Sequence, residues 1–88
     1  MKLIDGELKS LLSRSIYYGL VLEAIARGGR KHFNEIREYI TLRLNKYVAP
    51  SEVERALSNL MKMSIITRVA HGEYEIMDPI IRMKFGQV

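Results

Sequence analysis

The chain has 88 residues, of which 48% are hydrophobic, and it carries a formal net charge of +4 with no cysteine. This length suits a single domain spanning residues 1–88, and the lack of thiols excludes disulfides and thiolate metal sites. No apolar run approaches the roughly 18 residues needed to cross a bilayer, so we expect a cytoplasmic domain with no membrane partner. The positive charge favours an anionic partner such as nucleic acid, although many small basic proteins bind none.

A long amphipathic pattern predicts the first helix, from about Glu7 to Arg27. Its apolar residues recur every three or four positions, and beyond Ile16 they surround the helix almost completely. Such a helix is contacted on several sides, so we expect it at the centre of the fold. Because Tyr17 and Tyr18 are adjacent, and so about 100° apart around the axis, one should lie in the core and the other in an exposed patch.

A second helix is expected after a short extended link at residues 30–33. Gly28 and Gly29 end the first helix, because glycine is the residue that most readily terminates one. Asn34 has a side chain suited to cap the second helix, whose apolar pattern fades near Arg43.

The third helix, at about residues 51–63, has the clearest start signal in the chain. Ser51 and Glu54 fit a capping box, in which each side chain binds the backbone N–H of the other residue. The apolar residues of this helix fall on one side. The polar face opposite to them consists of Ser51, Arg55, Ser58, Asn59 and Lys62, with Glu52 and Glu54 on its borders.

Alternating apolar and polar residues predict an antiparallel hairpin over residues 65–77. Its two-residue turn, His71-Gly72, is expected to be of type I′, with both residues at positive φ. Arg68 then lies opposite Glu75, and a cross-strand ion pair is the favoured role for both. One face of the hairpin must rest on a helical layer, and its residues are Ile65, Thr67, Val69, Tyr74 and Ile76.

The order of elements predicts the fold class. Asp78 and Pro79 are good N-cap and first-turn residues for a last short helix after the hairpin. Three helices, a hairpin and a short helix make a mostly α chain with a small β-hairpin. This order is that of a winged helix–turn–helix, with a three-helix core, a C-terminal wing hairpin and a short final helix.

Four segments, "VLEAIARGG", "FNEI", "VERALSNLMKMSIITRV" and "GEYEIMDPIIR", carry a resemblance to a known family. Together they make residues 17–82 resemble the C-terminal winged-helix domain of archaeal P-loop ATPases. In that family the segment follows the ATPase core, and an aromatic strand leads into an Asp-Pro step like Tyr74 to Pro79 here. The resemblance implies a winged helix that is part of an ATPase or related to one.

Two features depart from that family. The chain has no G-x-x-x-x-G-K-[ST] loop, so it has nothing to cradle a nucleoside triphosphate and we expect no cofactor. Ser64 stands where the family often has a glycine after the third helix, so this C-cap should be strained or differently built.

The third helix is the expected site of DNA contact, because in a winged helix it usually enters the major groove. Arg55 suits guanine and Asn59 suits adenine, since each offers the two-pronged geometry of those base edges. Ser51, Ser58 and Lys62 suit phosphate oxygens. The alternative is an ordinary solvated helix face, and the two glutamates on its borders favour it because a carboxylate repels phosphate.

The other basic residues also have two interpretations, as DNA contacts or as residues that stabilise the fold. Arg27, Arg30 and Lys31, with His32, form the densest basic cluster, which either contacts the DNA backbone or complements the negative end of the first helix. Arg68 is the one permanent cation of the wing, and its expected pairing with Glu75 weakens its case as a DNA contact. The two histidines lie on separate turns without a cysteine partner, so we expect neither a metal site nor catalysis.

Two hypotheses therefore follow from the sequence. The first is a non-enzymatic domain that binds double-stranded DNA, as winged helices of transcription regulation do, with Arg30, Lys31, Ser51, Arg55, Ser58, Asn59, Lys62 and Arg68 as its site residues. The second is a protein-interaction domain that docks on a P-loop ATPase core or another partner. In either case an exposed tyrosine of the first helix offers a surface for an ATPase core or for a homodimer.

Overall fold

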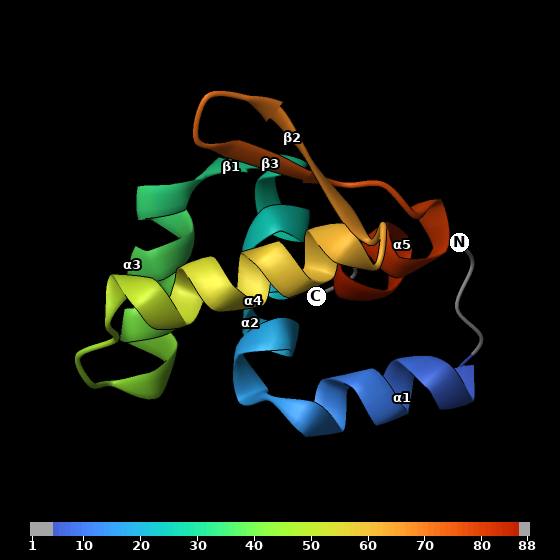
Figure 1. Cartoon of the computed structure of the whole chain (residues 1–88), viewed down its shortest axis with the longest axis horizontal. Coiled ribbons are helices and arrows are strands. Elements are labelled where there is room, and N and C mark those ends of the chain that lie inside the picture. Colours follow the sequence, from blue (N-terminus) through green and yellow to red (C-terminus); the bar gives the residue numbers. More distant parts are fainter. Residues whose placement is uncertain (1–4, 87–88) are drawn as a thin grey trace.

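The computed structural model describes residues 5–86, which form five helices and three strands (Figure 1). In chain order the elements are α1 (Asp5–Arg14), α2 (Ile16–Gly28), β1 (Arg30–His32), α3 (Phe33–Leu44), α4 (Pro50–Lys62), β2 (Ile66–Ala70), β3 (Glu73–Ile76) and α5 (Pro79–Gly86). Helices α2, α3 and α4 form the three-helix core, β2 and β3 form the wing, and α5 is the short final helix. The predicted winged helix–turn–helix is confirmed. None of the described helices is long and apolar enough to cross a membrane.

The first predicted helix is in fact two helices, because the chain bends at Ser15. This residue has an extended backbone (φ −158°, ψ 132°), and its Oγ accepts a hydrogen bond of 3.2 Å from the Tyr17 N–H. A serine that caps the following helix in this way interrupts the preceding one. The prediction of one helix from Glu7 to Arg27 is therefore wrong at this bend, which we call the elbow. Helix α1 lies below α4 in Figure 1 instead of continuing α2.

Helix α2 is the centre of the core, as its apolar pattern predicted. It packs against α1, α3, α4, α5 and the sheet. Leu22 and Ile25 are completely buried on it, and the helices around it contribute Ile36, Leu57 and Ile81. Each buried side chain of this size stabilises the fold by about 1.5–3 kcal/mol through its removal from water. The stability of the fold therefore depends mainly on the surfaces that α2 joins.

The segment expected to be an extended link, residues 30–33, contains a third strand, β1. β1 pairs with β3 antiparallel, with Arg30 opposite Glu75 and His32 opposite Glu73, and the sheet order is β1-β3-β2. The Phe33 N–H also donates a hydrogen bond of 2.8 Å to the Gly72 carbonyl. The wing hairpin is thus supported along one edge by β1 and underneath by the helices, which a two-stranded hairpin needs to be stable.

The pairing of β2 with β3 differs from the prediction by one residue. A bulge at Val69 leaves Ala70 opposite Glu73 but places Arg68 opposite Tyr74. Since side chains alternate along a strand, this shift moves every residue before the bulge to the other face. Val69, at the bulge, is 38% exposed, whereas Ile66 is buried together with Ile65, which lies just before β2.

The turn of the hairpin is not of type I′. Of its two residues, only Gly72 has a positive φ, of 72°. His71 keeps a negative φ, which a side chain with a Cβ adopts without strain.

The predicted helix caps are partly wrong. His32, not Asn34, is the N-cap of α3: its Nδ1 accepts a hydrogen bond of 3.2 Å from the Asn34 N–H, and Glu35 Oε1 accepts one of 3.0 Å from the His32 N–H. Helix α4 begins at Pro50, with Ala49 as an N-cap that makes no side-chain bond. Ser51 is thus already inside the helix, because proline at the first position sets the start one residue earlier.

Two other expectations about helix ends are confirmed. Asp78 Oδ1 accepts hydrogen bonds from the N–H groups of Ile80 (2.9 Å) and Ile81 (3.4 Å), which makes it the N-cap of α5. Ser64 has φ 60°, in the left-handed region that glycine adopts freely and serine does not. The backbone after α4 is therefore strained at the residue where the sequence predicted it.

Candidate nucleic-acid interface

Helix α4 presents one polar stripe to solvent. Val53, Ala56, Leu57 and Leu60 are buried against the core, and Figure 1 shows the helix crossing the front of the molecule, with the wing above it and α1 below. The residues that we call the α4 stripe lie opposite to the buried ones and recur every three or four positions. They are Ser51, Arg55, Ser58 and Lys62, of which only Ser58 is half-buried.

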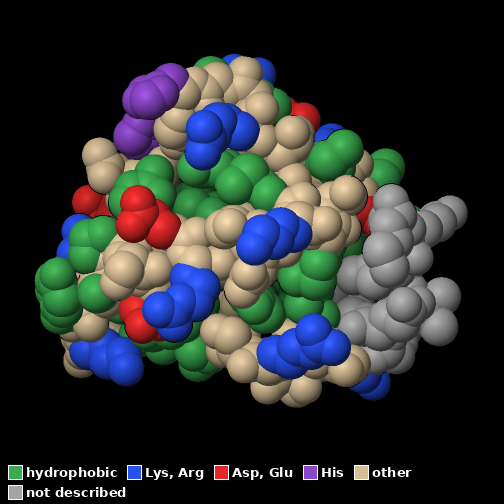
Figure 2. All heavy atoms as spheres, in the orientation of Figure 1, with side chains coloured by type: hydrophobic (Ala, Val, Ile, Leu, Met, Phe, Trp, Pro, Cys, Tyr) green, Lys and Arg blue, Asp and Glu red, His purple; other side chains and the backbone are tan. Residues whose placement is uncertain are grey.

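The cations of the α4 stripe are not neutralised within the protein. Among residues 9–85, Arg55 and Lys62 take part in no ion pair and no hydrogen bond. Glu52 is half-buried and Glu54 is exposed, and neither of them forms an ion pair with a described residue. Figure 2 shows Lys and Arg side chains spread over this side of the molecule, with acidic side chains between them. The face is therefore mixed in charge, with its cations free to meet an anion.

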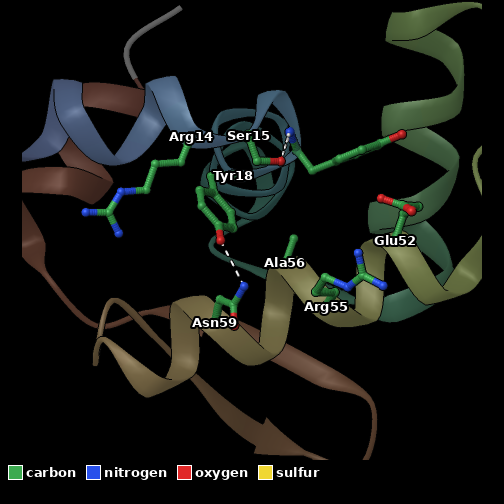
Figure 3. Close-up of a pocket in the computed structure, with 8 residues that line it drawn as sticks. Arg14, Ser15, Tyr18, Glu52, Arg55, Ala56 and Asn59 are labelled. Carbon is green, nitrogen blue, oxygen red and sulfur yellow. Dashed lines mark hydrogen bonds between the residues drawn. The ribbon is translucent and has the colours of Figure 1, made fainter.

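Asn59 is held by the protein itself. Its Nδ2 donates a hydrogen bond of 2.9 Å to the Tyr18 hydroxyl of α2, as Figure 3 shows, and the residue is half-buried. The two-pronged contact with adenine that the sequence suggested requires this bond to break. Asn59 thus joins α4 to α2. Of the two residues of α4 that the sequence suggested for base contacts, only Arg55 has a side chain that forms no hydrogen bond with a described residue.

Tyr17 and Tyr18 are both half-buried, so the predicted contrast between them is wrong. The reason is the elbow, which brings α1 and α4 around the start of α2 so that both rings are partly covered. Both tyrosines line a hollow of about 280 Å³ between the elbow and α4. Arg14 also lines it and was missed by the sequence analysis, because nothing in the local pattern showed that the end of α1 would lie near α4.

The wing places its arginine toward the core side of the hairpin. Opposite residues on paired strands share a face, so Arg68 lies on the same face as Tyr74, and its guanidinium stands 5.8 Å from the centre of that ring. The predicted pair between Arg68 and Glu75 is wrong, since the register shift puts them on opposite faces. Glu75 instead lies 3.6 Å from Arg82 Nη2. Arg68 therefore keeps its charge, and no described carboxylate pairs with it.

Arg30 and Lys31 do not adjoin the α4 stripe. They lie on β1, which packs against β3, α2 and α3, whereas α4 contacts β2 at the other edge of the sheet. Arg30 is 3.9 Å from Glu73, and the stem of Lys31 lies against Gly28. The structure thus divides the basic residues named from the sequence into two groups on different elements.

Two further arginines are used to join helices. Arg27 and Arg43 both bind the Tyr39 hydroxyl, at 3.1 and 2.9 Å, and Tyr39 in turn donates to Glu23 at 2.8 Å. The Tyr39 hydroxyl, followed by the Glu23 charge, raises the pKa of Arg43 above its ordinary value. This group fixes α3 against α2. It accounts for Arg27, which the sequence had placed in the basic cluster before β1.

Among residues 9–85, no three His, Cys, Asp or Glu side chains are grouped closely enough to hold a metal ion. His32 is committed to the cap of α3, and His71 lies at the exposed turn of the wing.

Comparison with known proteins gives one result that bears on this geometry. Residues 12–77 match the family described as the MCM protein C-terminal winged helix-turn-helix domain. No curated protein and no solved structure matches the chain significantly. MCM proteins are P-loop ATPases of the AAA+ class, so the resemblance seen in the sequence is confirmed. The matched residues include the three-helix core and the wing, and the chain therefore belongs to the family of MCM C-terminal winged helix–turn–helix domains.

Proposed function

We propose that this domain binds double-stranded DNA without catalysis, with α4 in the major groove and the wing beside it. The observation that carries the proposal is the distribution of paired and unpaired cations. Arg55 and Lys62 on α4 and Arg68 on β2, which packs against α4, form no ion pair within the described residues, whereas Arg30, Arg43 and Arg82 are paired with glutamates. Cations left unpaired on neighbouring elements are available to a polyanion.

Each unpaired group has a distinct role in this proposal. Arg55 lies in the middle of the α4 stripe, where a guanidinium is able to read the O6 and N7 edge of guanine. Lys62, at the end of α4, and Ser51, at its start, are positioned for phosphates on either side of the groove, with Ser58 between them. Arg68, on β2, is assigned a contact with the backbone of the DNA strand that runs beside the wing. The acidic borders of α4 reduce the net attraction, so we expect a nonspecific Kd on the order of micromolar or weaker at physiological salt.

The test is a titration of labelled duplex DNA at several salt concentrations. The double change Arg55→Ala and Lys62→Ala should weaken binding and lower the slope of log K against log salt by roughly 0.9, the contribution of the phosphate contact of Lys62, while the loss of Arg55 should also reduce discrimination for guanine. The matched control is Arg30→Ala with Lys31→Ala, which removes the same charge from β1 and should change the slope much less.

Two outcomes contradict the proposal. If the folded domain does not bind duplex DNA even at low salt, it is not a DNA-binding domain in isolation. If Arg30→Ala with Lys31→Ala lowers the slope as much as Arg55→Ala with Lys62→Ala does, DNA binding depends on the net charge of the domain and α4 is not the site.

A second function, protein docking, is favoured by an apolar surface away from the α4 stripe. Leu42 on α3 and Tyr47 in the turn before α4 are each 74% exposed, and Arg37 holds the Tyr47 ring with its guanidinium 5.3 Å from the ring centre. Exposed apolar groups on a polar rim are typical of protein contacts. For this family the expected partner is the ATPase core. Leu42→Ser with Tyr47→Ser should weaken association with an MCM ATPase core, measured by calorimetry, and leave duplex DNA binding unchanged.

A further inference from the structure

The hollow between the elbow and α4 gathers hydrogen-bond donors that have no acceptor. It has a volume of about 280 Å³, and the residues that line it include two arginines, Arg14 and Arg55, and a single acidic residue, Glu52. Figure 3 shows Arg14 on one side of the Tyr18–Asn59 bond and Arg55 on the other, with their guanidinium ends pointing away from each other. Neither arginine makes a hydrogen bond or an ion pair with a described residue.

Two hydroxyl groups in the hollow are also left with an unused proton. Ser15 Oγ accepts from the Tyr17 N–H, and the Tyr18 hydroxyl accepts from Asn59. A hydroxyl group has one O–H donor besides its acceptor sites, and neither O–H donates to any described residue. The surplus of donors therefore extends from the guanidinium groups to the hydroxyls. A ligand that matches it must be rich in acceptors and negatively charged.

The hollow is formed before any ligand arrives. The 2.9 Å bond between Asn59 and Tyr18 fixes α4 against α2, and Ala56 is too small to fill the space between them. Arg55 belongs both to this hollow and to the α4 stripe, so a strand of DNA following α4 passes beside the elbow. A phosphate group is the acceptor-rich anion that such a strand carries, and a guanidinium binds it with two parallel hydrogen bonds.

We propose that this hollow is a phosphate-binding site for the DNA backbone next to α4, with Arg14 as a contact residue. The proposal rests on the proposed function, which it deepens by extending the interface from α4 to α1. Arg14 is the last residue of α1 and lies near the start of residues 12–77 that match the family. The interface proposed here therefore includes the end of α1 as well as α4.

The test compares two changes of equal charge on the same helix. Arg14→Ala should lower the salt slope for duplex binding by roughly 0.9, as expected for one lost phosphate contact. Lys9→Ala removes another exposed cation of α1 that does not line the hollow, and should change the slope much less. The amide resonances of Ser15 and Tyr17 should shift on addition of the duplex to the unaltered chain.

The outcomes separate this proposal from the function on which it rests. If the unaltered chain binds no duplex, the proposed function fails, and the hollow has no DNA strand to bind. If the chain binds duplex through Arg55 and Lys62 but Arg14→Ala behaves like Lys9→Ala, the hollow is not a phosphate site and the proposed function stands. A loss of slope specific to Arg14, together with the amide shifts, supports the site.

Discussion

Asn59 on α4 donates its side-chain amide to the hydroxyl of Tyr18 on α2, over 2.9 Å. This bond connects the helix proposed to enter the groove with the central helix of the core. It also explains why Asn59 is half-buried although it lies on the polar side of α4. The residue that looked most suited to read adenine is thus part of the scaffold that holds α4 in place.

Removal of this bond should destabilise the domain. Tyr18→Phe keeps the ring but leaves the Asn59 amide without its acceptor, and we expect the free energy of unfolding to fall by about 0.5–1.5 kcal/mol. Tyr17→Phe is the matched control, because the Tyr17 hydroxyl makes no hydrogen bond with any described residue. Urea unfolding followed by circular dichroism measures both. Equal losses in the two variants would show that the bond does not contribute.

The cap of α3 should matter more than the serine that the sequence had placed at the start of α4. His32→Ala removes the acceptor for the Asn34 N–H and should cost about 1 kcal/mol, whereas His32→Asn keeps a capping side chain and should recover part of the loss. Ser51→Ala should change stability by less than about 0.5 kcal/mol, because Ser51 is an exposed residue inside α4. A larger loss from Ser51→Ala than from His32→Ala, in the same urea experiment, would mean that the caps are misplaced.

The strain at Ser64 should be relieved by glycine. A left-handed residue with a Cβ costs roughly 1–2 kcal/mol, while glycine costs about 0.5–1 kcal/mol in entropy, so Ser64→Gly should stabilise the domain by several tenths of a kcal/mol or more. Asn45, the C-cap of α3 at φ 54°, is the control, since asparagine tolerates this conformation and Asn45→Gly should gain less. Thermal unfolding compares the two variants. A lower midpoint for Ser64→Gly would show that the strain at this residue is smaller than the entropy that glycine loses on folding.

The tip of the wing should depend on its contact with β1. Gly72 and Gly29 both have a positive φ, of 72° and 79°, so alanine at either residue carries a backbone penalty. A Cβ at Gly72 would also lie 2.9 Å from His32 Nε2, whereas one at Gly29 would meet nothing within 4 Å. Gly72→Ala should therefore lower the unfolding midpoint more than Gly29→Ala. Equal midpoints would show that the wing tip moves away from His32 at no cost.

The amino-acid sequence by itself determined most of the elements and their order, though not the division of the first helix or the strand β1. The i, i+4 rows of α2, the alternation of β2 and β3, and the Asp78-Pro79 step each depend on residues close together in the chain. Such local patterns fix which face is apolar, and a small chain has few ways to bury those faces together. The winged helix and the family were therefore predicted before any contact was known, and so was the strain at Ser64.

Only the tertiary structure decided which distant residues meet. The pairing of β1 with β3 joins segments far apart in the chain, while the elbow at Ser15 and the bulge at Val69 interrupt the local periodicity from which the sequence was interpreted. These contacts divided the basic residues: Arg68 lost its expected partner Glu75, and Arg14 joined Arg55 beside a hollow. A periodic pattern states which side of an element is polar, but the partner of a charge depends on what packs next to it. That is why the fold was readable from the sequence and the composition of the interface was not.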